Sequence, residues 1–247
     1  MNRIKCVIAY DGTLFAGYQI QPRERTVQGE LEQALRKVHK GLETKVTASG
    51  RTDAGVHAVG QVIHFDTPYS IPEEKWPIIL NGLLPDDIAV KYAELTDSSF
   101  HARFSATGKE YRYRIYQSFH RSPHKRFYAA HYPHKLNIEA MEKAAGYLIG
   151  QHDFTSFCSA KTEVEDKVRR ITDIAIVQDQ EELELCFKGN GFLYNMVRIL
   201  TGTLVEVGAE KLSPEEVKGI LEAKDRSMAG KTAPAQGLYL WQVFYSN

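Results

Sequence analysis

The chain has only three cysteines among its 247 residues, and their positions exclude several classes of protein. Cys6, Cys158 and Cys186 are far apart, odd in number and without a CxxC spacing, so we expect neither a disulfide framework nor a zinc knuckle. The amino-terminal residues contain no signal-peptide core, and no apolar run approaches the length of about 18 residues that spans a membrane. We therefore expect a cytoplasmic protein that does not associate with membranes.

The chain also carries no net charge, because its 31 Lys and Arg residues balance its 31 Asp and Glu residues. This balance excludes a uniformly basic surface for nucleic acid, but it permits a local basic cleft balanced by acidic surface elsewhere. The content of 43% hydrophobic and 25% charged residues is typical of a globular protein with a sizeable core.

The signatures of several enzyme classes are missing as well. The chain has no GxSxG nucleophile motif, no P-loop and no dinucleotide-binding fingerprint. A metal site is an alternative, because four potential ligands lie close in sequence: Asp53, His57, His64 and Asp66. We do not favour it, since no third ligand among them has a spacing typical of metal sites.

What the sequence does contain is an alternation of strands with single helices. Apolar residues recur at helical spacing after Thr26, which we predict as an N-cap, and Ser213 to Glu216 has the pattern of a capping box. These patterns predict an α+β fold with a mixed or antiparallel sheet, in two halves of residues 1–104 and 105–247. Strands are expected at 4–10, 88–95, 109–117, 171–177, 182–189 and 237–245, and further helices at 76–83, 137–149 and 191–208.

A glycine-framed loop with unusual polar content precedes an apolar strand in the stretch ASGRTDAGVHAVGQVIHFDT. Gly50 and Gly55 permit backbone angles that other residues avoid, and the loop around them carries Arg51, Asp53 and His57. Two interpretations stay open on the pattern alone. Asp53 either bonds its own turn or presents its carboxylate at the mouth of a cleft, and Arg51 is either a phosphate contact or a surface charge.

The stretch KEYRYRIYQ alternates with a period of two and therefore predicts a strand. Tyr111, Tyr113 and Ile115 share one face of it, and Arg112 and Arg114 share the other. Such a strand is either half-buried and half-solvated, or it presents its guanidinium groups to RNA. The pattern does not separate these two interpretations.

Arg198 is the only basic residue between Gly191 and Gly208, in a segment that we predict to be an apolar helix. An uncompensated buried charge costs on the order of 3–5 kcal/mol, so the guanidinium either reaches solvent or pairs with a carboxylate inside a site. If that carboxylate belongs to Asp53, the pairing would lower the pKa of Asp53 and keep it ionised near neutral pH.

The segment SFHRSPHKRFYAAHYPHK, residues 118–135, combines four basic residues with four histidines, four aromatic residues and no acid. This composition is typical of an exposed basic loop. It is equally typical of a surface that contacts phosphates and stacks on bases, so both interpretations stay open.

Five blocks of the chain occur in a known order and spacing: YDGTLFAGYQIQ with TVQGELEQAL, SGRTDAGVHA, KEYRYRI, GNGFLYNMVR and APAQGLYL. On these blocks the chain resembles the tRNA pseudouridine synthase A family, from about Ile4 to Tyr245. SGRTDAGVHA resembles the family's catalytic-aspartate motif. Tyr18 departs from the family, which usually has tryptophan there, and the segment after Ser159 is more acidic than expected.

The resemblance implies an isomerase that converts uridine to pseudouridine at positions 38, 39 and 40, in the anticodon arm of tRNA. It implies no cofactor and no metal, because a C–N bond is exchanged for a C–C bond without electrons, phosphate or water being consumed. It also implies two ferredoxin-like halves that share a mixed, mainly antiparallel sheet, an active-site cleft between them, and a homodimer.

The same resemblance assigns roles to individual residues. Asp53 matches the catalytic aspartate, as nucleophile or base, whereas Tyr111 and Arg198 match active-site residues that bind the substrate. A ring at Tyr111 would stack on a flipped uracil and offset roughly 1–3 kcal/mol of the cost of unstacking it. The predicted RNA contacts are Arg51, His57, Arg103 and residues 118–135.

Two other classes of function are alternatives. A non-catalytic RNA-binding module would use the same basic and aromatic surface. Binding alone needs no buried carboxylate, so the presence of Asp53, Tyr111 and Arg198 together argues against it. A metal-dependent hydrolase is the second alternative, and sensitivity to chelators would reveal it.

Overall fold

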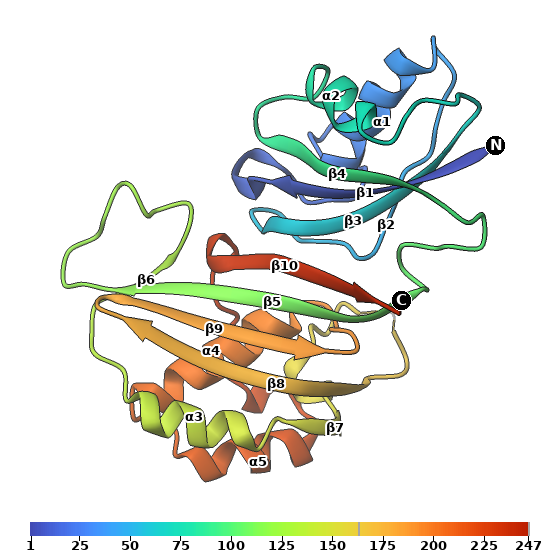
Figure 1. Cartoon of the computed structure of the whole chain (residues 1–247). Coiled ribbons are helices and arrows are strands. Elements are labelled where there is room, and N and C mark those ends of the chain that lie inside the picture. The colour runs from blue at the N-terminus through green and yellow to red at the C-terminus, as the bar shows by residue number, and fades with distance from the viewer. Residues whose placement is uncertain (163, 247) are drawn as a thin grey trace. The chain divides into compact units, whose positions relative to one another are not determined.

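The structure is a computed structural model that describes residues 1–162 and 164–246, and it confirms an α+β fold with mixed sheets (Figure 1). The chain divides into two compact units. Unit 1 comprises Met1–Thr107 and the chain from Tyr239 onward, and unit 2 comprises Gly108–Leu238. No helix among the described residues is long and apolar enough to cross a membrane.

The carboxy-terminal strand thus groups with unit 1, whereas the predicted division at residues 104 and 105 had placed it in the second half. The halves as predicted, the shared sheet and the cleft between the halves remain predictions.

Unit 1 is a sheet with the strand order β4-β1-β3-β10, and the short β2 pairs with β3. β1 is antiparallel to both neighbours, with Ile4 opposite Phe65 of β3 and Leu95 of β4. β10 is parallel to β3, with Tyr239 opposite His57. The elements are β1 (Asn2–Tyr10), η1 (Gly12–Leu14), α1 (Val27–Val38), β2 (Thr47–Ala48), β3 (His57–Thr67), α2 (Lys75–Asn81), β4 (Ile88–Thr96) and β10 (Leu238–Tyr245).

The helices of unit 1 follow from the sequence pattern. The side chain of Thr26 accepts a hydrogen bond from the backbone N–H of Gly29, which confirms the predicted N-cap of α1. The apolar stripe of α1 is buried. Trp76 of α2 packs edge-on against Phe65 of β3, with ring centroids 5.1 Å apart. These contacts give unit 1 its own core beneath the sheet.

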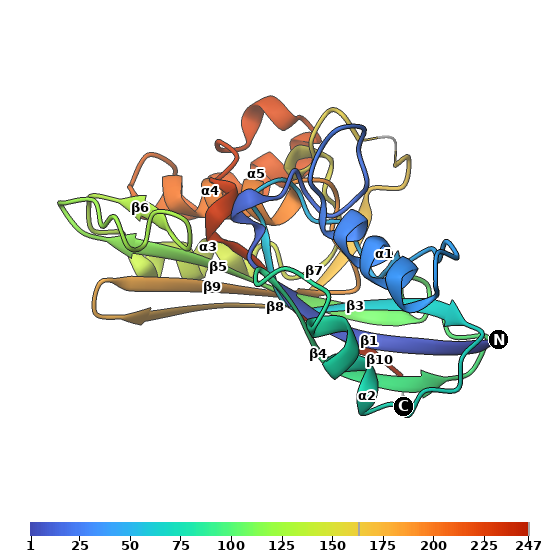
Figure 2. The same ribbon diagram turned by 90° about the horizontal axis from the view of Figure 1, so that it is seen from above.

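Unit 2 is a sheet with the strand order β5-β9-β8-β7, and β6 runs parallel to β5. Figures 1 and 2 show α3, α4 and α5 on one face of this sheet. The elements are β5 (Ala106–Gln117), β6 (Ala130–Tyr132), α3 (Ile138–Gly146), β7 (Gly150–Asp153), η2 (Thr155–Phe157), β8 (Val168–Asp179), β9 (Glu182–Gly189), α4 (Met196–Gly208), α5 (Pro214–Ala223), η3 (Arg226–Met228) and η4 (Ala235–Gly237).

The alternation of β5 is confirmed. Tyr111, Tyr113 and Ile115 are buried, and Tyr113 and Tyr111 lie opposite Leu185 and Phe187 of β9. This face of the strand therefore belongs to the core of unit 2, because alternate side chains of a strand point to the same side of its sheet.

The helix that carries Arg198 begins later than predicted. It starts at Met196 instead of residue 191, because Asn195 has left-handed backbone angles (φ 60°, ψ 6°) that cannot continue a helix. In α5 the carboxylate of Glu216 accepts hydrogen bonds from the backbone N–H and the hydroxyl of Ser213, at 2.7 and 2.9 Å. The predicted capping box is therefore confirmed.

Candidate active site

Asp53 lies half-buried on the loop of residues 49–56, which joins β2 to β3. The backbone N–H of Val56 donates to the carbonyl of Asp53 at 3.1 Å and closes a tight turn. Gly55, the third residue of this turn, has a φ of +77°. A residue with a side chain is strained at this positive φ, which the third position of a type II turn requires. This requirement explains the glycine of the SGRTDAG motif.

A second loop packs directly onto the Asp53 turn. A Cβ atom at Gly12 would lie 2.1 Å from the carbonyl oxygen of Val56, and one at Gly17 would lie 2.9 Å from that of Thr52. The backbone N–H of Tyr18 also donates to the Thr52 carbonyl, at 3.0 Å. The glycines of the YDGTLFAGYQIQ block therefore allow one backbone to touch the other.

Buried hydroxyl and amide groups hold the loop from below. The hydroxyls of Tyr10 and Thr52 are hydrogen-bonded at 2.7 Å. Gln61 of β3 accepts from the hydroxyl of Ser49 at 2.6 Å and donates to the carbonyl of Gly50 at 2.8 Å. All four side chains are buried. These bonds hold the loop at Ser49, Gly50 and Thr52, before the aspartate, and the bond from Val56 to the Asp53 carbonyl holds it after the aspartate.

His57 has a structural environment. Its side chain is 2% exposed, stacks on Tyr239 with ring centroids 4.7 Å apart, and accepts a hydrogen bond at Nδ1 from the backbone N–H of Gly12 at 3.0 Å. The structure thus places His57 in the support of the Gly12 loop, and the contact between His57 and RNA stays a prediction.

Arg51 and Arg103 are both exposed and belong to unit 1. Arg103 lies on the loop of residues 97–105, over the exposed ring of Phe104 at 5.7 Å. Their exposure is consistent with the predicted contacts to an RNA backbone.

The loop that carries Arg103 is anchored through Ala102. Its N–H donates to Nδ1 of the buried His64 at 3.1 Å, and its carbonyl accepts from the hydroxyl of Tyr245 at 2.7 Å. Burial, with added repulsion from Arg3 and His101, lowers the pKa of His64 to about 4. His64 is therefore neutral at physiological pH, which the acceptor role of Nδ1 requires.

Tyr111 is buried in unit 2, where its ring meets the edge of Phe192 with centroids 5.2 Å apart. Phe192 belongs to the GNGFLYNMVR block, so two of the blocks that carry the family resemblance contact each other here. Tyr111 lies in the middle of β5, and an aromatic pair of this kind offers a ring on which a planar base could stack.

Arg198 lies on the first turn of α4 and is held by two hydrogen bonds. Its Nε–H donates to the carbonyl of Ala233 at 2.7 Å, and Nη1 donates to the side-chain oxygen of Asn195 at 2.8 Å. The guanidinium is half-buried. These bonds restrict the orientation of the guanidinium group.

The predicted site residues are thus distributed over the two units. Arg51, Asp53 and His57 lie on or beside one loop of unit 1, whereas Tyr111 and Arg198 belong to unit 2. The pairing of Asp53 with Arg198 remains a prediction.

The arginines on the second face of β5 have carboxylate partners. Arg112 donates to Glu110 at 2.7 Å and to Glu184 at 3.0 Å, and Arg114 donates to Glu184 at 3.0 Å. Since Glu184 lies on β9, this face of unit 2 carries alternating charges across two strands. The face is less basic than the sequence of β5 alone indicates.

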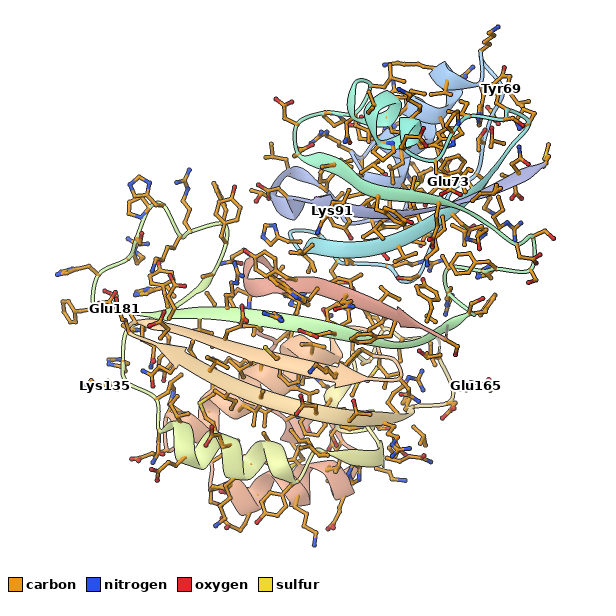
Figure 3. All side chains as sticks on the ribbon, viewed as in Figure 1. Tyr69, Glu73, Lys91, Lys135, Glu165 and Glu181 are labelled. Atoms are coloured by element: carbon orange, nitrogen blue, oxygen red, sulfur yellow. The ribbon has the colours of Figure 1, made fainter. Side chains whose placement is uncertain are left out.

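Residues 118–135 form the connection from β5 through β6 toward α3. Phe119 is 80% exposed, Arg126 lies over the ring of Phe127 at 4.2 Å, and Lys125 pairs with Glu182 at 2.7 Å. Figure 3 shows Lys135, the last residue of the segment, at the same end of unit 2 as the turn at Glu181. The segment is therefore exposed and combines rings with cations, as both interpretations of its sequence expected.

Hydrogen bonds within unit 1 engage His57, His64 and Asp66, which the sequence offered as metal ligands. Arg3 binds Asp66 through two hydrogen bonds of 2.8 Å, and the bonds of His57 and His64 are given above. Within residues 1–162 and 164–246, no group of three or more His, Cys, Asp or Glu side chains is placed to hold a metal ion.

Comparison with known proteins identifies the family. A family model described as tRNA pseudouridine synthase matches residues 6–105 and 144–246. The chain is 60% identical over 246 residues to tRNA pseudouridine synthase A of Bacillus subtilis (strain 168), across 99% of this chain and 100% of that protein. The chain belongs to the tRNA pseudouridine synthase family.

Further relatives in this family bear the same name. The chain is 62% identical over 247 residues to tRNA pseudouridine synthase A of Anoxybacillus flavithermus, over the full length of both proteins. It is 57% identical over 246 residues to that of Geobacillus kaustophilus, across 100% of this chain and 95% of the relative. Members of the family are isomerases that convert uridine to pseudouridine in tRNA.

The family match separates the site residues into two groups. Asp53 and Arg198 lie inside the matched ranges, whereas Tyr111 and the basic segment 118–135 lie between them. Among solved structures, a chain of a Cbf5–Nop10–Gar1 complex overlaps 82% of this chain and 54% of its own length, with a TM-score of 0.35 and 11% identity. This likeness is too weak to carry an argument.

Several supporting residues were not predicted from the sequence. The structure adds Thr52 within the Asp53 loop, Tyr10 and Gln61 in contact with it, and Asn195 and Ala233 beside Arg198. Asn195 lies three residues before Arg198, a spacing that brings side chains together at the start of a helix. This spacing in the sequence could have predicted the contact between the two side chains. The others act through contacts between distant parts of the chain.

Proposed function

We propose that this pseudouridine synthase modifies uridines 38, 39 and 40 in the anticodon arm of tRNA, with Asp53 as the catalytic residue. One observation supports the role of Asp53 above the others. Tyr10 and Tyr18 hold the SGRTDAG loop at Thr52 and Gln61 holds it at Gly50, directly before a half-buried aspartate, and the N–H of Val56 closes the turn after it. A turn that only reverses the chain needs no such support.

The proposed reaction conserves all atoms of the substrate. The bond between N1 of uracil and C1′ of ribose breaks, the base turns, and C5 bonds to C1′. The proton on C5 is lost and N1 gains one, so no oxidant and no second substrate is needed. Asp53 acts as a nucleophile toward ribose or uracil, or as the base that takes a proton from the sugar.

Asp53 must be ionised for any of these roles. We propose that Arg198 pairs with it and keeps the pKa of the carboxyl low enough for ionisation at neutral pH. The bonds of Arg198 to Ala233 and Asn195 support this role, because they present the guanidinium in one orientation. An arginine fork held in a plane suits a carboxylate better than a flexible ammonium group does.

Tyr111 is the proposed stacking surface for the flipped uracil. Removing a base from its stack costs a few kcal/mol, and an aromatic ring beneath it offsets part of this cost. The hydroxyl of Tyr111 is also a candidate for assisting the loss of the C5 proton.

The remaining proposals concern RNA and assembly. Arg51, Arg103 and residues 118–135 are the proposed contacts to the RNA backbone, and their exposure supports this role. A homodimer in the cytoplasm is proposed from the family resemblance and the cysteine pattern. Two copies would offer one tRNA more surface than a single electroneutral chain does.

Release of tritium from C5-labelled uridine in unmodified tRNA tests the catalytic assignment. We expect the wild type to release tritium in metal-free solution with EDTA, and Asp53→Asn to release none above background. Asp86→Asn is the matched control, because Asp86 is an exposed aspartate of the same unit. Equal release by wild type and Asp53→Asn would refute the role of Asp53.

The other outcomes separate the alternatives. Binding of tRNA without release by the wild type would favour a binding module, and loss of release with EDTA would favour a metal-dependent enzyme. Three tRNA transcripts, each with uridine at only one of positions 38, 39 and 40, test the specificity. Release from uridines elsewhere would refute the positions and leave the synthase activity standing.

A further inference from the structure

The segment of residues 230–237, between η3 and β10, lies directly on α4 in unit 2. A Cβ atom at Gly202 of α4 would lie 1.7 Å from the carbonyl oxygen of Lys231, and one at Gly230 would lie 2.8 Å from Cα of Thr203. No side chain fits between backbones at this distance. The two glycines therefore let the backbone of the segment contact the backbone of α4 at Gly202 and Thr203.

Hydrogen bonds hold the segment in register with α4. The backbone N–H of Gly230 donates to the hydroxyl of Thr203 at 3.0 Å, and that of Ala233 donates to the carbonyl of Arg198 at 3.0 Å. The carbonyl of Ala233 accepts from Nε of Arg198 at 2.7 Å. Ala233 and Arg198 are thus joined twice, and the Ala233 carbonyl, together with the side chain of Asn195, orients the guanidinium.

Tyr113 of β5 holds the next carbonyl of the segment. Its ring is fully buried, and its hydroxyl donates to the carbonyl of Pro234 at 2.7 Å. A Cβ atom at Gly237 would lie 2.6 Å from Cζ of this ring, so the segment also packs on it. Burial raises the pKa of Tyr113, which keeps its hydroxyl protonated and able to donate.

The peptide group between Ala233 and Pro234 thus lies between two side chains. Arg198 binds the carbonyl on one side of it and Tyr113 binds the carbonyl of the next residue. Since a peptide unit is planar and the φ angle of proline is nearly fixed, the ψ angle of Pro234 is the one soft torsion between the two carbonyls, and holding the Pro234 carbonyl restricts the direction of the Ala233 carbonyl.

We propose that Tyr113 is a positioning residue of the synthase, which sets the direction of the Arg198 guanidinium through Pro234 and Ala233. The proposal rests on the proposed role of Arg198 in the reaction. It gives the APAQG part of the carboxy-terminal block a function: this segment is the template that holds Arg198. Tyr113 itself contacts neither uracil nor ribose in this scheme.

Tyr113→Phe removes the hydroxyl and keeps the ring. We expect the single-turnover rate of tritium release to fall by about tenfold, which corresponds to about 1.4 kcal/mol, with the Kd for tRNA within about twofold of wild type. In an Arg198→Lys background the same substitution should change the rate by less than about twofold, because an ammonium group lacks the planar fork that the segment aligns.

Ser156→Ala is the matched control for stability. Its buried hydroxyl donates to the carbonyl of Ile220 at 2.6 Å and accepts from the backbone N–H of Asp225 at 2.8 Å, in the same unit. We expect Ser156→Ala to lose at least as much stability as Tyr113→Phe, and only Tyr113→Phe to lose rate. Equal loss of rate in the two variants, or equal effects of Tyr113→Phe in the wild-type and Arg198→Lys backgrounds, would overturn the proposal.

A readout without activity separates this proposal from the proposed function. Exchange of the Arg198 Nε proton, followed by nitrogen-15 NMR and assigned by its loss in Arg198→Lys, should become at least threefold faster in Tyr113→Phe. If the wild type releases no tritium, the proposed function fails, whereas faster exchange would still support the positioning role. Unchanged exchange and an unchanged rate would overturn it.

Discussion

Alanine at Gly202 and alanine at Gly219 are the same substitution in two helices of unit 2, yet we expect opposite effects on stability. In a helix interior, alanine is favoured over glycine by about 0.5–1 kcal/mol, because glycine loses more backbone entropy on folding. A Cβ atom at Gly219 of α5 meets nothing within 4 Å among the described residues. Gly219→Ala should therefore stabilise the protein by about that amount.

At Gly202 the helical gain is opposed by a steric clash. The added Cβ atom would lie 1.7 Å from the Lys231 carbonyl oxygen, although real contacts of this kind are longer than 3.0 Å. The segment must retreat by more than about 1 Å, and overpacking of this kind costs about 1–3 kcal/mol. After the helical gain of about 0.5–1 kcal/mol is subtracted, Gly202→Ala should destabilise the protein by up to about 2.5 kcal/mol.

Urea denaturation at constant pH measures both free energies of unfolding. The two variants should differ by at least about 1 kcal/mol, with wild type between them. Gly202→Ala should also slow tritium release, since a displacement of about 1 Å in a positioning group can cost on the order of a hundredfold in rate. If Gly202→Ala were as stable and as active as Gly219→Ala, the close contact between Gly202 and Lys231 would be refuted.

Two further predictions concern buried polar groups of unit 1. The hydroxyl oxygen of Tyr18 is buried and has no hydrogen-bond partner among the described residues, so Tyr18→Phe should raise the free energy of unfolding by about 1 kcal/mol. A loss of stability in thermal unfolding would instead show that the hydroxyl is hydrogen-bonded. The pKa of His64 is lowered to about 4 in the folded protein, below its ordinary value of 6.5, so the unfolded chain binds more protons between these values. The contribution of neutral His64 to the free energy of unfolding should therefore be complete above pH 6.5 and be lost toward pH 4, by up to about 1.4 kcal/mol per pH unit. His64→Asn should flatten the fall in the free energy of unfolding from pH 7 to pH 5. An equal fall in wild type and variant would contradict this account.

Local patterns predicted the elements of the fold well, because their causes lie within a few residues. The N-cap at Thr26 and the capping box at Ser213 are confirmed for this reason. The start of α4 was predicted too early. The apolar run from Gly191 continues through residues that have no helical backbone, and the left-handed angles of Asn195 carry no apolar signal.

Contacts between distant residues were beyond the sequence pattern. The pairing of β10 with β3 joins Tyr239 to His57 across most of the chain, and it buries the histidine that we had predicted to contact RNA. Likewise, the charge of Arg112 is matched by Glu184 on another strand. A period of two reports which residues share a face, but it does not report which strand lies beside them.

The two loops that support the proposed chemistry use the same physical device. Gly12 lets one backbone touch the Asp53 loop, and Gly202 lets another touch the helix of Arg198. In both places a hydrogen bond to a backbone carbonyl, and not a side-chain contact alone, sets the position of the functional group. A backbone carbonyl moves only when its whole segment moves, whereas a side chain can change rotamer at little cost. We therefore infer that substitutions at these glycines affect the reaction more than changes in the neighbouring side chains of similar volume do.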